Sequence, residues 1–492
     1  MEINNLISFY RKHQDYAKDI HMLVTDTDTW ELVHLMLVEC SGINIHVYCK
    51  NATTIKEIKK VLDWEDKLQK SNTLSFDSME DLMALDQIGV LMFDEKIDHR
   101  LVLQLADKKP QALVGLMRGT NVSYLQIWEA YKDSCKYVYL RYLLVNGKTE
   151  IFDWTKSEND MMLSVIFPVY NVAKYLDQCI ESISAWKAPY VEYLFVNDGS
   201  PDNSRDIILK YAKKDPRIKL IDKPNGGCAS ARQKGLEAAK GRYIGFIDPD
   251  DFIDPDMFRQ LLGRALLGSY ELCYCGYNEY YETTGTIKPM EDALGDPYAW
   301  GTINKDEIQR LIIHQRTAIW RGIYARELID RAQIEFQTNL RRFDDLPFKI
   351  EVCAQAKSAV ALKQFLYYYR LDRPGQDVSC TDERLYVHFD IFKHLDEICN
   401  RLDERKLKDY LQVAKVQTHA YAMKKLQEKF VTEYARQAKE DFNQNAGILR
   451  TLLCLKHWLG GNGKGAYLSM MLGFEKLYKK KLIRLEAKEK KA

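Results

Sequence analysis

Three short apolar runs, each followed by polar residues, constrain the fold of this chain more than any other feature. The runs cover residues 163–167, 193–196 and 244–247. Each is rich in β-branched or aromatic residues, and a sequence with helical periodicity follows the first two. The repeated order of strand, loop and helix predicts a parallel α/β sheet. Ligands bind beyond the carboxyl ends of the strands in such sheets, so the polar residues there are expected at one edge. They include Asn171, Asp198, Asp248 and Asp250.

The length of 492 residues exceeds what one compact core supports, so two or three domains are expected. The composition, with 46% hydrophobic and 29% charged residues, is that of an ordinary soluble protein. A net charge of +1 gives no overall attraction to nucleic acid, which we exclude as a partner. No apolar run reaches the ~18 residues of a membrane span, and the first residues do not resemble a signal peptide. The 11 unpatterned cysteines are typical of reduced thiols in the cytoplasm.

Three carboxylates stand within four residues directly behind the third run, in Asp248-Pro249-Asp250-Asp251. Such close negative charges repel one another unless a cation or hydrogen-bond donors offset them. A diphosphate ligand would also require positive charge between itself and these carboxylates. Oxygen ligands of this kind favour Mg²⁺ or Mn²⁺ as the cofactor. The alternative is a cap for the helix expected after Asp254, which needs no metal.

Four motifs follow one another in this region: FPVYN at 167–171, VNDGS at 196–200, NGGCASARQKGLEAAKGRY at 225–243 and FIDPDD at 246–251. As a set, in this order and spacing, they resemble the nucleotide-sugar domain of family 2 glycosyltransferases. The resemblance covers roughly residues 162–379 and implies the GT-A fold, a Rossmann-like α/β fold with a mainly parallel sheet. It leaves a smaller α/β region over 1–155 and a helical region over 380–492, which we treat as separate domains.

The resemblance implies a role for most of the polar residues at the expected sheet edge. Nucleotide-sugar contacts would come from Pro168, Tyr170, Asn171, Asp198, Gly227, Arg232, Asp248 and Arg370. Among these, Asp248 would contact the ribose and Arg370 would meet the leaving diphosphate. The metal would bind to Asp250, with assistance from Asp251.

The residues themselves support part of these roles. The Asp198 carboxylate can accept a hydrogen bond from the imino N–H of a uracil-type base. The helix that opens at Gly227 presents a positive N-terminal end, which favours an anion near Arg232. Structural roles remain open: a helix cap for Asp198, close packing for Gly227, and solvated positions for Arg232 and Arg370.

A second acidic pair, Asp344-Asp345, stands after a basic run and before an expected helix. In the family that the motifs resemble, an acidic pair, usually Glu-Asp, opens a helix beneath the acceptor. The pair here departs from that pattern, because the first carboxylate is shorter and leaves open which of the two acts. We assign the general base to Asp345 by position, with Asp344 as the other catalytic candidate. The alternative is a helix cap in a favourable dipole.

The first 155 residues alternate between strand-like and helix-like runs and predict a small Rossmann-like domain of unknown role. It contains neither a G-x-G-x-x-G sequence nor a P-loop. Asp26 and Asp28 imitate a D-x-D motif behind a strand, which a second donor site or a plain helix cap would explain. The polar stretch 148–160 is expected to link this domain to the next.

Residues 380–492 show helical periodicity throughout. The glycine-rich stretch 460–465 is similar to a P-loop but lacks the Ser or Thr after its lysine and a preceding strand, so a loop is expected. From Phe474 to Lys491 apolar residues alternate with lysines. This pattern predicts a basic amphipathic segment that lies on an anionic bilayer, and a frayed, solvated end is the alternative.

Together these observations predict an inverting, metal-dependent glycosyltransferase, with the inversion implied by the resemblance alone. It would move a sugar from a nucleoside-diphosphate sugar to a hydroxyl of a saccharide or lipid-linked saccharide, in the synthesis of a bacterial surface polysaccharide. Its expected place is the cytoplasm, with a peripheral contact at the inner face of the cell membrane. One alternative is a sugar-nucleotide nucleotidylyltransferase, which would normally begin with a Gly-rich activating loop. The other is a non-catalytic nucleotide-sugar binding scaffold, which the intact acidic motifs disfavour.

Overall fold

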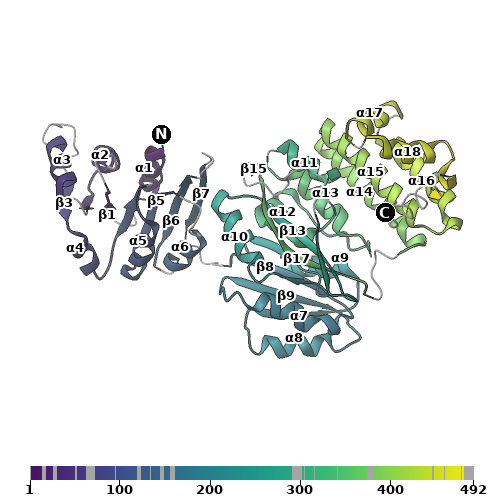
Figure 1. Ribbon diagram of the computed structural model, residues 1–492, viewed down its shortest axis with the longest axis horizontal. Helices are drawn as coiled ribbons and strands as arrows, with labels where there is room; N and C mark the ends of the chain where they lie inside the picture. The colour runs from purple at the N-terminus through teal and green to yellow at the C-terminus, as the bar shows by residue number, and fades with distance from the viewer. Residues whose placement is uncertain are drawn as a thin grey trace. The chain divides into compact units, whose positions relative to one another are not determined.

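The chain forms two compact units, Met1–Asp160 with Gly263–Tyr270, and Met161–Leu262 with Glu271–Ala492. Figure 1 labels their helices and strands. The structure is a computed structural model that describes residues 2–13, 18–25, 30–49, 52–62, 72–94, 96–118, 124–132, 134–143, 149–155, 161–290, 302–303, 305–314, 316–340, 342–373, 380–445, 448–458, 460–477 and 479–480.

The first unit is built on a seven-stranded sheet, counted over its described residues, in the order β3-β2-β1-β4-β5-β6-β7. The strands are β1 (Asp19–Leu23), β2 (Asn44–Tyr48), β3 (Thr73–Asp77), β4 (Val90–Phe93), β5 (Ala112–Arg118), β6 (Tyr137–Leu143) and β7 (Thr149–Thr155). All neighbours pair in parallel except β6 and β7, which are antiparallel. The first six strands thus have the order of a Rossmann sheet, which confirms the predicted layout.

Helices connect the parallel strands, as parallel pairing requires, and a further helix precedes the first strand. They are α1 (Glu2–His13), α2 (Trp30–Glu39), α3 (Ala52–Leu62), α4 (Met79–Ala84), α5 (His99–Gln104), a 3₁₀ turn η3 (Leu105–Lys108) and α6 (Tyr124–Tyr131). Alternate strand residues such as Ile20 and Met22 are fully buried and join one core with Leu6 of α1 and Val33 of α2. This alternation follows from the period of two in a strand.

Two expectations for this unit need comment. The stretch 148–160 is not simply a linker, because Thr149–Thr155 forms β7 and pairs along its whole length with β6. Its polar residues suggested a linker, but an edge strand has one neighbour only and tolerates charged side chains. Asp26 and Asp28 lie outside the described residues.

The second unit contains a ten-stranded sheet among its described residues, with the path β10-β9-β8-β11-β16-β13-β17-β12 and with β14 and β15 beside β13 and β17. The strands are β8 (Leu163–Val169), β9 (Val191–Asp198), β10 (Ile218–Lys223), β11 (Tyr243–Phe246), β12 (Phe252–Ile253), β13 (Leu272–Tyr281), β14 (Thr286–Met290), β15 (Thr302–Ile303), β16 (Gly322–Ala325) and β17 (Ala359–Leu371). The four strands from β10 to β11 are parallel. Because β9 and β11 lie on opposite sides of β8, the sheet has a topological switch point between β8 and β11.

Helices cover this sheet, and a further group of helices follows it. They are α7 (Ala173–Ser184), α8 (Ser204–Ala212), α9 (Cys228–Ala238), α10 (Met257–Gly268), α11 (Lys305–His314), η4 (Ile319–Arg321), α12 (Arg326–Ala332), α13 (Asp345–Gln355), η6 (Glu383–Tyr386), α14 (Val387–Leu402), α15 (Arg405–Lys425), α16 (Glu428–Asn445), α17 (Ile448–Trp458) and α18 (Gly460–Met471). Helix α9 lies close to β8. A Cβ at Gly235 would stand 2.4 Å from Cγ2 of Ile166, so this approach requires a residue without a side chain.

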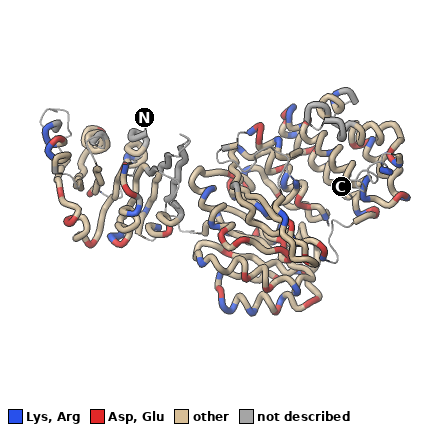
Figure 2. The backbone as a smooth tube through the Cα atoms, viewed as in Figure 1, with Lys and Arg blue, Asp and Glu red and all other residues tan. Residues whose placement is uncertain are grey.

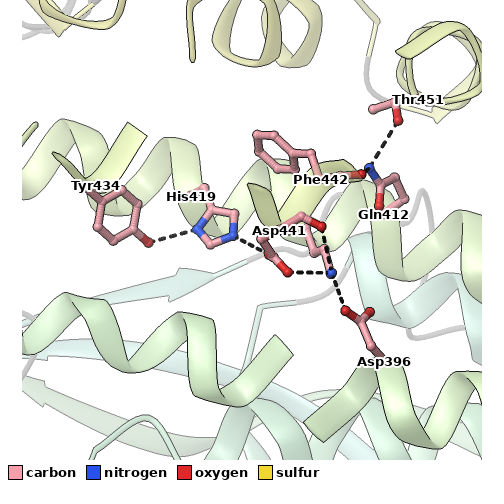
Figure 3. A network of polar contacts seen from close by, with 8 residues as sticks. Asp396, Gln412, His419, Tyr434, Asp441, Phe442 and Thr451 are labelled. Atoms are coloured by element: carbon pink, nitrogen blue, oxygen red, sulfur yellow. Dashed lines mark hydrogen bonds and ion pairs between the residues drawn. The ribbon is translucent and has the colours of Figure 1, made fainter. Parts of the chain in front are cut away.

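A buried polar network joins α14, α15 and α16 (Figure 3). Lys415 is fully buried and donates to Asp396 at 2.6 Å and to Asp441 at 2.7 Å. The other oxygen of Asp441 lies 2.8 Å from Nε2 of His419, whose Nδ1 lies 2.9 Å from the hydroxyl of Tyr434. Burial lowers the pKa of His419. A neutral His419 that donates to Asp441 accepts from Tyr434, so these side chains pair with one another and tie the three helices together.

The sequence predicted a loop for the glycine-rich stretch 460–465. In the structure this stretch is the first half of α18. Helix α18 packs against α15, α16 and α17, and this packing overrides the poor helix propensity of glycine. In the described part of the chain no helix is long and apolar enough to cross a membrane. Basic and acidic residues are interspersed over both units, in keeping with the net charge of +1 (Figure 2).

Candidate active site

The predicted site residues lie at the carboxyl ends of three neighbouring parallel strands. Asn171 follows β8, Asp198 ends β9 and Asp248 follows β11, which places them around the switch point. Pro168 lies inside β8, one residue before the strand ends. Tyr170 directly follows the strand and is 50% exposed. The sequence therefore placed this sheet edge correctly, because strand ends can be read from where apolar runs stop.

The turn after β8 is held from the neighbouring loop. Asn171 has a left-handed backbone with φ +55°, and its N–H donates to Oγ of Ser200 at 2.7 Å. The first N–H of α7, at Ala173, donates to the Asp202 carboxylate at 2.8 Å. Asp202 also accepts from Ser204 N at the start of α8. Asp202 thus serves both helices, because its two oxygens face two helix starts, although the N-cap residue of α8 is Asn203.

Asp198 holds the loop that opens α9. Its two oxygens accept from Gly226 N at 2.9 Å and from Gly227 N at 2.7 Å, and Lys223 forms an ion pair with it. The side chain is 2% exposed. Gly227 has φ +90°, a conformation that other residues rarely adopt, and it is the N-cap of α9. The carboxylate thus holds the glycine loop through hydrogen bonds. Only its remaining lone pairs can accept hydrogen bonds from a ligand.

Arg232 connects the two acidic motifs. This buried guanidinium on α9 donates to Asp248 at 2.6 Å and to Asp344 at 2.8 Å. It also lies 6.0 Å from the ring centre of Phe336. Because Asp248 follows β11 and Asp344 precedes α13, the arginine links the strand-end carboxylates to the second acidic pair. The sequence nominated all three residues but gave no reason to expect that they touch.

The three carboxylates of the D-P-D-D motif have different surroundings. Asp251 is buried and accepts from the Tyr367 hydroxyl and from Arg370 N, both at 2.7 Å. Asp250 is 5% exposed and forms an ion pair with Arg373. Asp248 is the most exposed of the three, at 27% of its side chain. Asp251 therefore anchors β17, whereas Asp250 pairs with Arg373 and Asp248 pairs with Arg232.

Arg370 lies beneath the motif and is fully engaged. Its Nε donates to the carbonyl oxygen of Asp250 at 2.7 Å and its Nη2 to Gln178 at 2.5 Å. A further ion pair joins it to Glu282 just behind β13. The side chain is 3% exposed. These contacts make Arg370 a link between β17 and α7, whereas Arg373, two residues beyond the end of β17, pairs with Asp250.

The residues present suit a divalent cation only in part. Among the described residues no group of three or more His, Cys, Asp or Glu side chains has the geometry to hold a metal. Burial and the neighbouring Asp248 raise the pKa of Asp250, and Arg373 lowers it. Asp248 and Asp250 are paired with Arg232 and Arg373, and their oxygens match the ligands of Mg²⁺ or Mn²⁺ provided that a ligand supplies the remaining oxygens.

The second acidic pair stands at the start of α13 and is divided by its contacts. Asp344 is buried and bonded to Arg232, whereas Asp345 is partly exposed. Burial is the largest cause that raises the pKa of Asp345 to about 7; Arg232 opposes it, and Asp344 and Asp248 add to it. A carboxyl group that titrates near neutrality is suited to take up a proton.

Several residues of the site could not be identified from the sequence alone. Tyr367 bonds Asp251 from 116 positions away and stacks on Trp320 with ring centres 4.0 Å apart. Glu282 and Lys223 neutralise Arg370 and Asp198. Partners so far apart in the chain leave no local pattern, so only the fold reveals them.

Comparison with known proteins gives a match of residues 164–329 to the glycosyl transferase family 2 profile. EpsJ of Bacillus subtilis (strain 168), an uncharacterized glycosyltransferase, is 34% identical over 214 residues, or 42% of this chain and 61% of the relative. Chondroitin synthase of Pasteurella multocida (strain Pm70) is 31% identical over 152 residues, which cover 31% of this chain and 15% of that protein.

A solved structure, S. aureus TarS 1–349 in complex with UDP-GlcNAc, resembles this chain with a TM-score of 0.53 at 19% identity. It covers 65% of this chain and 92% of that one. This likeness confirms the predicted fold class. The chain spans 61% of the length of the relative EpsJ, less than two thirds.

Proposed function

We propose, from the match of residues 164–329 to glycosyl transferase family 2, that the chain is an inverting, metal-dependent glycosyltransferase. It transfers a sugar from a nucleoside-diphosphate sugar to an acceptor hydroxyl. The observation that carries the proposal is the division of one acidic pair: Arg232 engages Asp344 and leaves Asp345 to titrate near neutrality. We assign the catalytic domain to roughly residues 162–379, with 1–155 as an accessory domain and 380–492 as a helical region.

The donor binds across the carboxyl ends of β8, β9 and β11. The exposed ring of Tyr170 offers a flat surface to the base, beside the loop that Asp198 and Gly227 shape. Asp248, which accepts a hydrogen bond from Arg232, contacts the ribose. The N-terminal end of α9 adds positive potential where the diphosphate lies.

Asp250 and Asp248 are the residues that would hold a divalent cation, because Asp251 is already bonded to β17. The cation supplies positive charge to the leaving diphosphate when it is bound. Arg373, which pairs with Asp250, carries the guanidinium that would also meet that diphosphate.

Asp345 acts as the general base. The acceptor oxygen forms a bond to the anomeric carbon while the bond from that carbon to the diphosphate oxygen breaks on the opposite face, which inverts the configuration. The hydroxyl proton passes to the Asp345 carboxylate, and the diphosphate leaves with the bonding electrons. Arg232 engages Asp344 in an ion pair, so the base is assigned to Asp345 alone.

The acceptor is a saccharide or lipid-linked saccharide of a bacterial surface polysaccharide. The names of the relatives, a chondroitin synthase among them, support this substrate class. With a lipid-linked acceptor the reaction would take place at the inner face of the cell membrane, with the chain in the cytoplasm.

A nucleotide-product assay over a panel of donors tests the function. UDP-GlcNAc heads the panel, since the TarS structure was solved with it. The proposal requires that the parent chain and the surface variant Asp330→Asn release a nucleoside diphosphate. Asp345→Asn should not release it. Release of pyrophosphate instead would indicate a nucleotidylyltransferase, and donor binding without any released nucleotide would indicate a scaffold.

A further inference from the structure

Exposed apolar side chains are concentrated near the end of the described chain. Nine large hydrophobic residues are exposed among the described residues, and five of them lie between positions 453 and 477. They are Leu453 (59% exposed), Leu468 (37%), Leu472 (63%), Phe474 (55%) and Leu477 (67%). Scattered exposed leucines are common, but such a concentration marks an interaction surface.

The backbone brings four of these side chains together. Leu468 and Leu472 stand four residues apart on α18 and its C-terminal turn, so they lie on one face. The helix stops at Gly473, which has φ +78°, and Phe474 N donates to Ser469 O at 2.8 Å across this end. The chain therefore turns directly after Leu472 and carries Phe474 and Leu477 next to the same helix end.

The charged residues of this segment are mainly lysines. Lys476 and Lys480 are exposed, whereas Glu475, the carboxylate within the segment, is only 6% exposed. No exposed Asp or Glu occurs among the described residues from 468 to 480. Apolar side chains and lysines thus alternate along this segment, and Glu428 of α16, which interacts with Lys479, adds an acidic group from outside it.

We propose that this surface, formed by Leu468, Leu472, Phe474, Leu477, Lys476 and Lys480 and called here the tail surface, docks on an anionic lipid bilayer. Apolar side chains enter the boundary between headgroups and acyl chains while lysines meet the anionic headgroups. Docking on a second copy is disfavoured, because a symmetric contact would bring like charges together. The contact is peripheral, and it is independent of the proposed transfer reaction because none of its residues belongs to the active site.

Vesicle sedimentation of the full chain tests the proposal. The chain is mixed with phosphatidylcholine vesicles that contain or lack phosphatidylglycerol, at low and high salt. The charge variant is Lys476→Glu with Lys480→Glu, and the apolar variant is Leu472→Ser with Phe474→Ser. The matched control is Ile287→Ser with Lys288→Glu, which changes an exposed apolar residue and its exposed lysine on β14.

The parent and control chains should sediment with anionic vesicles at low salt and be released at high salt, where charges are screened. The charge variant should bind anionic vesicles at least about tenfold more weakly, and the apolar variant should lose binding at either salt concentration. Equal binding to neutral and anionic vesicles, or binding that both variants retain, would overturn the proposal. So would a concentration-dependent dimer that the apolar variant abolishes without any vesicle binding. Donor hydrolysis by every variant, measured in parallel, separates this outcome from a failure of the proposed function.

Discussion

The guanidinium of Arg232 lies 2.8 Å from the carboxylate of Asp344, a residue 112 positions further along the chain. The same guanidinium lies 2.6 Å from Asp248. One buried cation thereby couples the acidic residue behind β11 to the acidic pair at the start of α13. In the proposed mechanism this coupling engages Asp344 and leaves Asp345 to take up the proton.

Arg232→Gln should shift the pH dependence of transfer. Loss of the positive charge makes Asp345 easier to protonate, because Arg232 is the contact that lowers the pKa of this carboxyl group. Since the base must be ionised, the acidic limb of kcat/KM should move to higher pH, by about one unit or more. The measurement is kcat/KM from pH 5 to 9, with the exposed Arg242→Gln as the matched control. An unchanged acidic limb would mean that the bridge does not tune the base.

Asp345→Asn should make the folded chain more stable at high pH. The pKa of Asp345 is raised to about 7, so its contribution to the free energy of unfolding is complete below the ordinary value near 4 and is lost as the pH rises through 7. Asparagine does not titrate and does not undergo this loss. The gain in Tm over the parent chain should therefore be larger at pH 8 than at pH 4. Asp330→Asn, at an exposed position, should show no such dependence, and an equal gain at both pH values would contradict the environment assigned to Asp345.

Much of this site could be predicted from the sequence because its positions are marked by local patterns. The strand ends at Asn171, Asp198 and Asp248 appear where apolar runs stop, and the turn residues around Gly227 identify a helix start. What could not be predicted is which polar groups pair, since Arg232 and Asp344 meet only through the packing of α9 against the sheet.

The same limit explains the elements that differ from expectation. Thr149–Thr155 has too many polar residues to suggest a strand, yet pairing with β6 makes it one. The glycines at 460–465 argue against a helix locally, and contacts with neighbouring helices outweigh them. The role of Asp251 in metal binding stays a prediction, but its bond with Tyr367 could not be predicted, because it depends on a strand much later in the chain.

Removal of metal should abolish transfer, and Asp250 should account for metal affinity. Asp250→Asn should weaken Mn²⁺ binding in the presence of a nucleoside diphosphate by about tenfold or more, as read by electron paramagnetic resonance. Asp251→Asn should leave this affinity nearly unchanged, because Asp251 is bonded to Tyr367 and Arg370. Full turnover in EDTA, or equal losses of affinity in both variants, would count against this division of roles.

Tyr367→Phe should lower stability by about 1–3 kcal/mol, because the buried Asp251 carboxylate loses one of its two donors. Thermal unfolding of the full chain measures the effect as a lower Tm. Tyr368→Phe is the matched control, since this neighbouring residue on β17 stacks its ring on Phe252 with centres 4.7 Å apart. Equal Tm values for the two variants would show that the Asp251–Tyr367 bond does not anchor the strand.

The most direct test of the account is to titrate a donor sugar nucleotide into folded Asp345→Asn and then to measure transfer by the same sample. The account predicts that donor affinity hardly changes, because Asp345 faces the acceptor, and that kcat falls by roughly 10²-fold or more, the scale of a lost general base. Normal turnover in this variant together with an inactive Asp344→Asn would assign the base to Asp344 and contradict the division made by Arg232. Normal turnover in both variants would remove the pair from the mechanism.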